Sequence, residues 1–305
     1  MRRFGKCALI LAGLGAATSC VQRDPADQQA RVAARHALLE ERRAAPDTAP
    51  GTPVAKWILP LGLGEISGLV LTRDGRLVAH DDELGRVTVI DARGGVLLKQ
   101  FNLGDRQTLA DFEGITMVND VFYMVTSRGA LYEFREGLDG DRVHFTIHDL
   151  NLGQECEIEG VAHDAQLMAL VMPCKIVLAS DLEDKFVLYR WPLGGGVGSQ
   201  VERFIMPLET VIGSNDWKQF RPTDITVDPK TGHYVLVAAQ EQGLLEMTRT
   251  GQVIRSMPLP GDHPQAEGIA ITPDGLLIVS DESGNHSATI TVYRWPLAAG
   301  EKSQP

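Results

Sequence analysis

The sequence predicts an all-β fold, a five-bladed β-propeller of four-stranded antiparallel blades, from a repeated phrase and the turns that follow it. The phrase consists of an apolar residue, a polar or acidic residue, a Gly or Asp, and a second apolar residue. The Gly or Asp positions lie 46, 46, 64 and 44 residues apart, a spacing typical of propeller blades. The five copies are Ile66-Ser67-Gly68-Leu69, Phe112-Glu113-Gly114-Ile115, Ile158-Glu159-Gly160-Val161, Pro222-Thr223-Asp224-Ile225 and Ala266-Glu267-Gly268-Ile269.

Turn residues follow the first apolar run in three of the five units, and they favour hairpins. A second, third and fourth strand are expected after each turn, which makes one blade per unit. The interval of 64 residues predicts additional loop in the third unit, at 175–185 and 194–200. The three turns are Arg73-Asp74-Gly75, Asp228-Pro229-Lys230-Thr231-Gly232 and Pro273-Asp274-Gly275.

The two ends of the repeat array are complementary. The fifth unit ends after its third strand, whereas residues 56–61 resemble the fourth strand of the other units. We therefore predict that this N-terminal strand completes the last blade, because closing the ring removes exposed strand edges. The propeller domain is expected to span residues 54–305.

The first 20 residues are typical of a bacterial signal peptide. A basic start at Arg2, Arg3 and Lys6 precedes an apolar run that is too short to span a bilayer as a helix. The run closes on Ala17-Thr18-Ser19-Cys20, which is similar to a lipobox and predicts lipidation of Cys20. Ordinary signal cleavage near the same point is the alternative.

Residues 21–53 are predicted to form a stalk. The stretch 27–45 is rich in Ala, Arg, Glu and Gln and predicts a short polar helix, which Pro46 ends. The Pro-rich stretch that follows indicates a stiff linker. We expect this segment to hold the domain away from a membrane, or to act only as a spacer.

The formal net charge of −11 favours cations, or ligands bound through a cation. Nucleic acids and anionic membrane surfaces bind basic patches, so neither is expected as a partner of the folded domain. Membrane contact is therefore expected only through the N-terminal anchor. No P-loop, GxGxxG or Gly-x-Ser-x-Gly motif occurs where a nucleotide or acyl site would require it.

The repeated phrases are expected to gather acids on one face of the ring. Because successive strands alternate in direction, the phrases and the turns between second and third strands share that face. The inner row of acids comprises Glu113, Glu159, Asp224 and Glu267. The outer row comprises Glu83, Glu241 and Glu282.

Two interpretations of the inner row stay open. Carboxylates that converge on one axis repel one another, which favours a bound hard cation such as Ca²⁺ with the inner row as its ligands. Alternatively, each carboxylate accepts backbone N–H bonds from the next blade and is architectural. The outer row is expected in solvated turns. The blades contain no His or Cys cluster with the spacing of a zinc site.

Cys156 and Cys174 are the only cysteines beyond the N-terminal segment. Cys156 precedes the phrase of the third unit and Cys174 ends its second strand, so both are expected on the acidic face of one blade. In an exported protein this arrangement predicts a disulfide, and two separate buried thiols are the alternative.

Several of the phrases, together with the Asp281-Glu282 turn, resemble the SdiA-regulated (YjiK-like) family over roughly residues 54–298. The resemblance implies a five-bladed propeller related to NHL-repeat proteins, with a bound calcium ion and no settled activity, and it extends to esterase-like phytase propellers. Ser67 and Thr223 stand where other phrases have an acid, so a ring of ligands would be incomplete. The phrases that carry the resemblance are Glu65-Ile66-Ser67-Gly68-Leu69, Phe112-Glu113-Gly114-Ile115, Ile158-Glu159-Gly160-Val161 and Ala266-Glu267-Gly268-Ile269.

Two functions are compatible with these features. The first is a ligand- or partner-binding module at the bacterial cell envelope, as a periplasm-facing lipoprotein or a soluble periplasmic protein, with calcium in a carboxylate-rich channel mouth. The second is a metal-dependent hydrolase, a lactonase or a phytase-like phosphoesterase, with Glu113, Glu159 or Glu267 as the base. Whether the chain is an enzyme stays open. The expected partner is an unknown small ligand or an envelope protein, and the propeller is expected to be a monomer.

Overall fold

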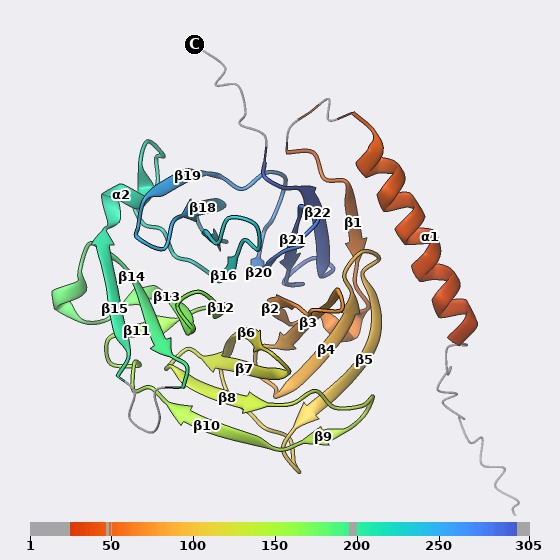
Figure 1. The fold of residues 1–305 in the computed structure, drawn as a ribbon, viewed down its shortest axis with the longest axis horizontal. Helices are drawn as coiled ribbons and strands as arrows, with labels where there is room; N and C mark the ends of the chain where they lie inside the picture. Colours follow the sequence, from red (N-terminus) through yellow and green to blue (C-terminus); the bar gives the residue numbers. More distant parts are fainter. Residues whose placement is uncertain (1–24, 47–48, 50, 195–199, 298–305) are drawn as a thin grey trace, which may run out of the picture.

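The computed structural model describes residues 25–46, 49, 51–194 and 200–297. Within them, five sheets surround a central axis (Figure 1), so the predicted five-bladed β-propeller is confirmed. The predicted signal peptide and the lipidation site at Cys20 lie outside the described residues.

Each blade is a sheet in which the strands follow one another outward from the axis. Blade 1 contains β2 (Ile66–Leu71), β3 (Arg76–Asp81), β4 (Arg86–Asp91) and β5 (Val96–Leu103), and β9 (Arg142–Val143) adds to its edge in parallel. Blade 2 contains β6 (Phe112–Val118), β7 (Val121–Thr126), β8 (Ala130–Phe134) and β10 (Phe145–Asp149). Blade 4 contains β16 (Asp224–Val227), β17 (Tyr234–Ala238), β18 (Gly243–Met247) and β19 (Val253–Pro258).

Blade 3 has an interrupted inner strand. The segments β11 (Cys156–Ile158) and β12 (Ala162–Asp164) both pair with β13 (Ala169–Val177), which is followed by β14 (Lys185–Pro192) and β15 (Glu202–Pro207). The prediction of a loop from residue 175 was wrong for its first part, because residues 175–177 continue β13 and pair with β11. The 3₁₀ helix η2 (Ser180–Leu182) lies in the remainder, and additional length lies at 208–223, where α2 (Leu208–Ile212) follows β15.

The N-terminal strand closes the ring as predicted. Blade 5 contains β20 (Ala266–Ile271), β21 (Leu276–Asp281) and β22 (Thr289–Arg294), and β1 (Ala55–Ile58) pairs antiparallel with β22 as its outermost strand. The short 3₁₀ helix η1 (Leu61–Leu63) then connects β1 to blade 1. Backbone hydrogen bonds between the two ends of the array therefore hold the first and last blades together.

The hydrophobic core lies between neighbouring blades. In β3, Leu77 and Ala79 pack toward blade 5 while Val78 packs toward blade 2, because side chains alternate between the two faces of a strand. Both faces of each inner sheet are covered, which explains why these strands are continuous apolar runs. Five clusters of this kind, one at each junction between blades, bury the core of the described residues.

The helix α1 (Pro25–Ala44) packs along the outer edge of the ring beside β1 and β5 (Figure 1). Leu39 is fully buried in the cluster between blades 5 and 1, and Arg43 forms an ion pair of 2.7 Å with Asp274. The sequence predicted a helix in a stalk that holds the domain away from a membrane; the helix is present, and its buried leucine packs it against the propeller. No helix in the described residues is long and apolar enough to cross a membrane.

Candidate functional site

The inner strands meet so closely at the axis that only glycine fits at most of the contact points. A Cβ atom on Gly114 would lie 2.5 Å from the Cα atom of Gly160, and one on Gly68 would lie 2.9 Å from the Cα atom of Gly114. Real Cβ atoms do not approach other atoms this closely. The glycines of the repeated phrases therefore form a floor at which the backbones of the blades touch.

Asp224 takes the glycine position of its phrase and completes this floor. Its carboxylate is fully buried, and Oδ2 accepts the N–H groups of Ile269 at 2.8 Å and Leu69 at 3.2 Å. Burial raises the pKa of Asp224 well above its ordinary value, although these N–H groups oppose the change. The residue joins blade 4 to blades 5 and 1, which is the architectural role that the sequence left open for the inner row.

The three inner-row glutamates lie above the floor together with a lysine. Lys175 Nζ lies 2.7 Å from Glu159 Oε1, and Glu159 is only 6% exposed. Burial opposes the charge of Lys175, but the carboxylates of Glu159, Glu267 and Glu113 keep its pKa above the ordinary value. Lys175 was not predicted as a site residue, because the sequence pattern placed it in a loop rather than in β13.

Glu113 and Glu159 share a proton. Burial, followed by the charge of Glu159 and a hydrogen bond to it, raises the pKa of Glu113 to about 10. Glu113 is therefore protonated at neutral pH, and burial also raises the pKa of Glu159, which the charge of Lys175 lowers. This arrangement stabilises two close carboxyl groups without a metal ion.

Glu267 has an intermediate character. Its pKa is raised to about 7. Burial is the largest cause, the charge of Lys175 opposes it, and the charges of Glu159, Asp281 and Asp82 add to the increase. At neutral pH this carboxyl group therefore exchanges a proton readily. Among the three inner-row glutamates, it is the one that interacts with both Lys175 and Asp82.

A second group of acids lies beside Glu267, between blades 5 and 1. One carboxylate oxygen from each of Glu65, Asp82 and Glu282 lies within 4.8 Å of the others. Burial, a hydrogen bond to Glu65 and the charges of Glu65 and Asp82 raise the pKa of Glu282 to about 8. We call these three residues the carboxylate triad.

The outer row predicted from the sequence does not lie together. Glu282 belongs to the carboxylate triad, Glu83 is exposed, and Glu241 Oε2 instead accepts the N–H group of Arg221 at 3.1 Å. The strands β3 and β21 end at Asp81 and Asp281, so the counterpart of Glu282 is Asp82. The predicted alignment of Glu83 with Glu282 was wrong by one residue.

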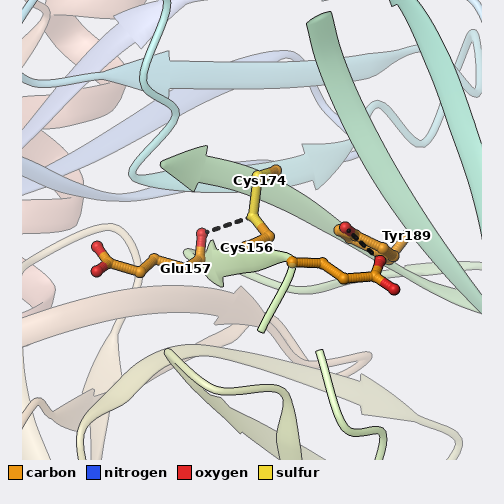
Figure 2. The surroundings of a disulfide bond; sticks show 5 residues. Cys156, Glu157, Cys174 and Tyr189 are labelled. Carbon is orange, nitrogen blue, oxygen red and sulfur yellow. Dashed lines mark hydrogen bonds between the residues drawn. A yellow bond between two sulfur atoms is a disulfide. The ribbon is translucent and has the colours of Figure 1, made fainter. Parts of the chain in front are cut away.

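The predicted disulfide between Cys156 and Cys174 is present, with a Cα–Cα distance of 5.7 Å. Figure 2 shows it between β11 and β13, with Tyr189 of β14 nearby. Cys174 directly precedes Lys175, and Cys156 lies three residues before Glu159. The covalent bond therefore holds together the two strand segments that carry the Lys175–Glu159 pair.

A buried histidine that was not predicted from the sequence contacts the end of β21 beneath the acidic face. His263 is 1% exposed, and its two ring nitrogens lie 2.7 Å from Asp281 Oδ2 and from the Tyr293 hydroxyl group. Thr289 donates a further hydrogen bond to Asp281 Oδ2 at 3.2 Å. Since all these partners are buried, the network fixes the end of β21, from which Glu282 extends.

Two surface depressions flank the acids. One of about 390 Å³ is lined by Lys175, Lys185 and Arg221, and another of about 490 Å³ is lined by Asp111 and Arg128 among others. Asp111 also raises the pKa of Glu113 through its charge. We define the acidic mouth as Glu113, Glu159, Glu267, Lys175 and the carboxylate triad; the two hollows adjoin it on the side of Glu113 and Lys175.

The chain has a recognisable family relationship at its C-terminal end. Residues 221–296 match the SdiA-regulated family. The matched segment contains blade 4 and the part of blade 5 from β20 to β22, which confirms there the resemblance noted from the sequence. None of the curated proteins compared matches the chain.

Solved structures that resemble the protein are propellers of other activities. A glutaminyl cyclase of Myxococcus xanthus is 14% identical, with 79% of this chain and 95% of that chain covered and a TM-score of 0.54. A gluconolactonase of Xanthomonas campestris is also 14% identical, with 75% and 73% covered and a TM-score of 0.43. Identities this low show the shared fold alone.

Proposed function

We propose that the protein is a binding module whose acidic mouth holds a divalent cation, Ca²⁺ by preference, at the carboxylate triad. The observation that carries the proposal is the approach of Glu65, Asp82 and Glu282 oxygens to within 4.8 Å of one another. Oxygen-only donors suit a hard cation, and Ca²⁺ accepts irregular carboxylate sites better than Mg²⁺ does. Glu267 is close enough to interact electrically with this group and is the natural fourth contributor.

The electrostatics of the two halves of the mouth support this assignment. Lys175 already supplies a positive charge to Glu159, so that half does not require a metal ion. In the described residues, no Lys or Arg forms an ion pair with a member of the triad, and burial, a hydrogen bond to Glu65 and the neighbouring negative charges together raise the pKa of Glu282. A bound cation would relieve it. The sequence-based ligand set of Glu113, Glu159, Asp224 and Glu267 is thereby replaced in our proposal by the triad with Glu267.

A cation at this position would leave part of its coordination shell for a ligand. Anionic groups of a small molecule or of an envelope protein would bind through the cation, and the flanking hollows would contact the rest of the ligand. We further propose that the chain acts in the bacterial cell envelope as a lipoprotein anchored at Cys20. The disulfide supports an oxidising compartment, because such bonds persist outside the reducing cytosol.

Calorimetric titration of the purified protein with Ca²⁺ tests the proposal. We expect saturable binding in the wild type and at least a ten-fold weaker affinity in Glu282→Gln, because one charged ligand is lost. Glu83→Gln is the matched control, since Glu83 is exposed and lies one residue from Asp82. Equal affinities of Glu282→Gln and wild type, or no binding of Ca²⁺ at all, would disprove the assignment.

A second candidate function is a metal-dependent hydrolase, and the pKa of Glu267 favours it. Burial and the neighbouring acids raise the pKa of Glu267 to about 7 in the metal-free protein, and a cation at the triad would lower it, so the ionised carboxylate would be available as a general base at neutral pH. The cation would polarise a lactone or phosphoester, and Glu267 would accept a proton from water. A panel of lactones and phosphomonoesters tests this candidate: Ca²⁺-dependent turnover that Glu267→Gln abolishes supports it. Absence of turnover in the calcium-loaded wild type leaves the binding module.

A further inference from the structure

A second cavity lies on the axis, at the face opposite the acidic mouth. It has a volume of about 320 Å³ and is lined by the inner strands of all five blades. In blade 1, Ile66 pairs with Asp81 at the mouth end of the sheet, whereas Leu71 and Arg73 at the other end of the same strand line the cavity. The length of β2 therefore separates the two sites.

The cavity has a closed inner end. The glycine floor and Asp224 lie between it and the acidic mouth, and the buried Asp224 carboxylate joins blade 4 to the backbones of Leu69 and Ile269. Because the floor consists of backbone atoms in contact, a ligand enters the cavity only from its own face. We call this cavity the axial pocket.

Its lining combines apolar walls with a basic rim. Leu71, Met117, Val161 and Ile271 contribute aliphatic surface, and no Asp or Glu occurs among the residues that line it. This composition contrasts with the net charge of −11 of the whole chain. Thr116 and Thr226 also line the pocket, so its walls combine aliphatic surface with hydroxyl groups and carry no carboxylate.

Arg73 supplies the positive charge at the rim. Its guanidinium group donates a hydrogen bond of 2.6 Å to Asn119 Oδ1 and forms no ion pair with a carboxylate in the described part of the chain. Asp74 and Asp120 border an adjoining depression with Arg73 but do not line the pocket. The guanidinium group therefore retains donors for an incoming anion.

His163 lines the pocket next to this charge. Burial lowers its pKa, and the charge of Arg73 lowers it further, although the neighbouring Asp164 opposes the change. The imidazole is therefore neutral at physiological pH and adds polarity without a second charge. Asp164 itself is turned to Arg249 at 2.6 Å and Tyr234 at 2.8 Å, and it is fully buried.

We propose that the axial pocket binds a small amphiphilic monocarboxylate, with the carboxylate on Arg73 and the aliphatic or aromatic body against the apolar walls. One rim cation matches one negative charge, and the aliphatic side chains of the walls match an apolar body, with Thr116, Thr226 and His163 as additional polar groups. The volume lies at the lower end of the range for small-molecule sites, which restricts the ligand to a small molecule of about the size of octanoate. This inference is independent of the cation proposed for the acidic mouth.

Calorimetric titration with octanoate, octan-1-ol and octylamine tests the charge preference. We expect saturable binding of octanoate, weaker binding of octan-1-ol and no saturable binding of octylamine. Arg73→Gln should weaken octanoate about ten-fold and leave octan-1-ol unchanged, since only the charged partner is lost. Arg135→Gln is the matched control, because Arg135 is exposed and borders the adjoining depression rather than the pocket. Equal affinity for octanoate and octylamine would overturn the proposal, as would an undiminished affinity in Arg73→Gln.

The position of the bound molecule requires a separate measurement. A diazirine analogue of octanoate, activated by light and located by peptide mass spectrometry, should label residues 69–73, 115–117, 161–163, 225–229 or 271–273. Excess octanoate should suppress this labelling. Labelling confined to peptides of the acidic mouth, or labelling that octanoate does not suppress, would show that the axial pocket is not the site.

Discussion

The ammonium group of Lys175 lies 2.7 Å from Glu159 Oε1, and it places a positive charge inside a cluster of carboxyl groups. Because of this pair, the acidic mouth has two halves that differ in charge compensation. One half contains its own counter-ion and a shared proton between Glu113 and Glu159. The other half, the carboxylate triad, has no counter-ion among the described residues, and burial together with a hydrogen bond to Glu65 raises the pKa of Glu282 to about 8. Our proposal places an external cation there.

Lys175→Met should destabilise the protein, because Glu159 would then be buried without its partner. We expect a loss of about 2 kcal/mol in the free energy of unfolding, measured with urea. Lys175→Arg retains the charge and should lose less. In the double variant Lys175→Met, Glu159→Gln, part of the stability should return, since no uncompensated charge remains. Strict additivity of the two substitutions would show that the pair is not coupled.

The stability of the metal-free protein should fall as pH rises from about 5 to 8. Glu282, with a pKa of about 8, and Glu267, with a pKa of about 7, hold protons in the folded state that the unfolded chain has already released above pH 4.5. Since the folded state binds more protons, its advantage is lost as pH rises through these values. Thermal melts in EGTA should show the decline.

The same melts distinguish the triad from the rest of the protein. Glu282→Gln should reduce the decline between pH 5 and 8, and Glu83→Gln should not alter it. Saturating Ca²⁺ should also reduce it, because the cation binds the ionised carboxylates. A pH profile of Glu282→Gln that parallels the wild type would contradict the assignment of the titration to this residue.

Asp224→Ala should be among the most damaging single substitutions at the axis. It leaves the buried N–H groups of Leu69 and Ile269 without an acceptor, at a cost of about 3 kcal/mol in unfolding free energy. Asp224→Asn keeps an oxygen in place and should cost clearly less. Calcium affinity should not change in Asp224→Asn. A large loss of Ca²⁺ binding in that variant would restore Asp224 as a ligand.

Removal of the disulfide should lower stability and disturb the mouth. The bond closes a loop over a sequence separation of 18 residues, which corresponds to about 3 kcal/mol. Cys156→Ala combined with Cys174→Ala should show this loss in urea unfolding and should be insensitive to a reductant. The wild type treated with the reductant should approach the double variant. Identical wild-type unfolding with and without the reductant, after complete reduction is verified, would contradict the prediction.

Leu39→Ala should loosen the helix α1 from the propeller. The side chain is fully buried, and its truncation typically costs about 2–5 kcal/mol. Hydrogen exchange should increase across Pro25–Ala44 while the inner strands stay protected. Glu41→Gln, at an exposed position of the same helix, is the control. Unchanged exchange in Leu39→Ala would mean that the helix does not depend on this contact.

The architecture could be predicted from the sequence because a repeated phrase marks the start of each blade. The phrase at Ile66, the turn at Gly75 and the incomplete fifth unit predicted the blades and the closing strand β1, and both are found. The helix at 27–45 was predicted as well. Its docking was not, because one leucine in a polar helix gives no signal of burial before its partner surface is known.

The candidate site was less accessible, because it depends on register and on contacts between blades. Asp224 was grouped with the glutamates by charge, although its place in the phrase is that of the glycines. Glu83 was aligned with Glu282 by the similarity of the turns, whereas the strand ends align Asp82 with it. Lys175 reaches the mouth through the bulged pairing of β11 with β13, which no local pattern in the sequence reveals.

The close approach of Gly114 to Gly160 determines whether a small molecule can pass along the axis of the ring. Many ring-shaped proteins have a channel along their axis, but here the backbones of the inner strands block it partway along. A ligand of the axial pocket would therefore enter and leave from the same face, and its binding would not require passage through the acidic mouth. The acidic mouth and the axial pocket therefore occupy opposite faces of the ring, with the glycine floor between them.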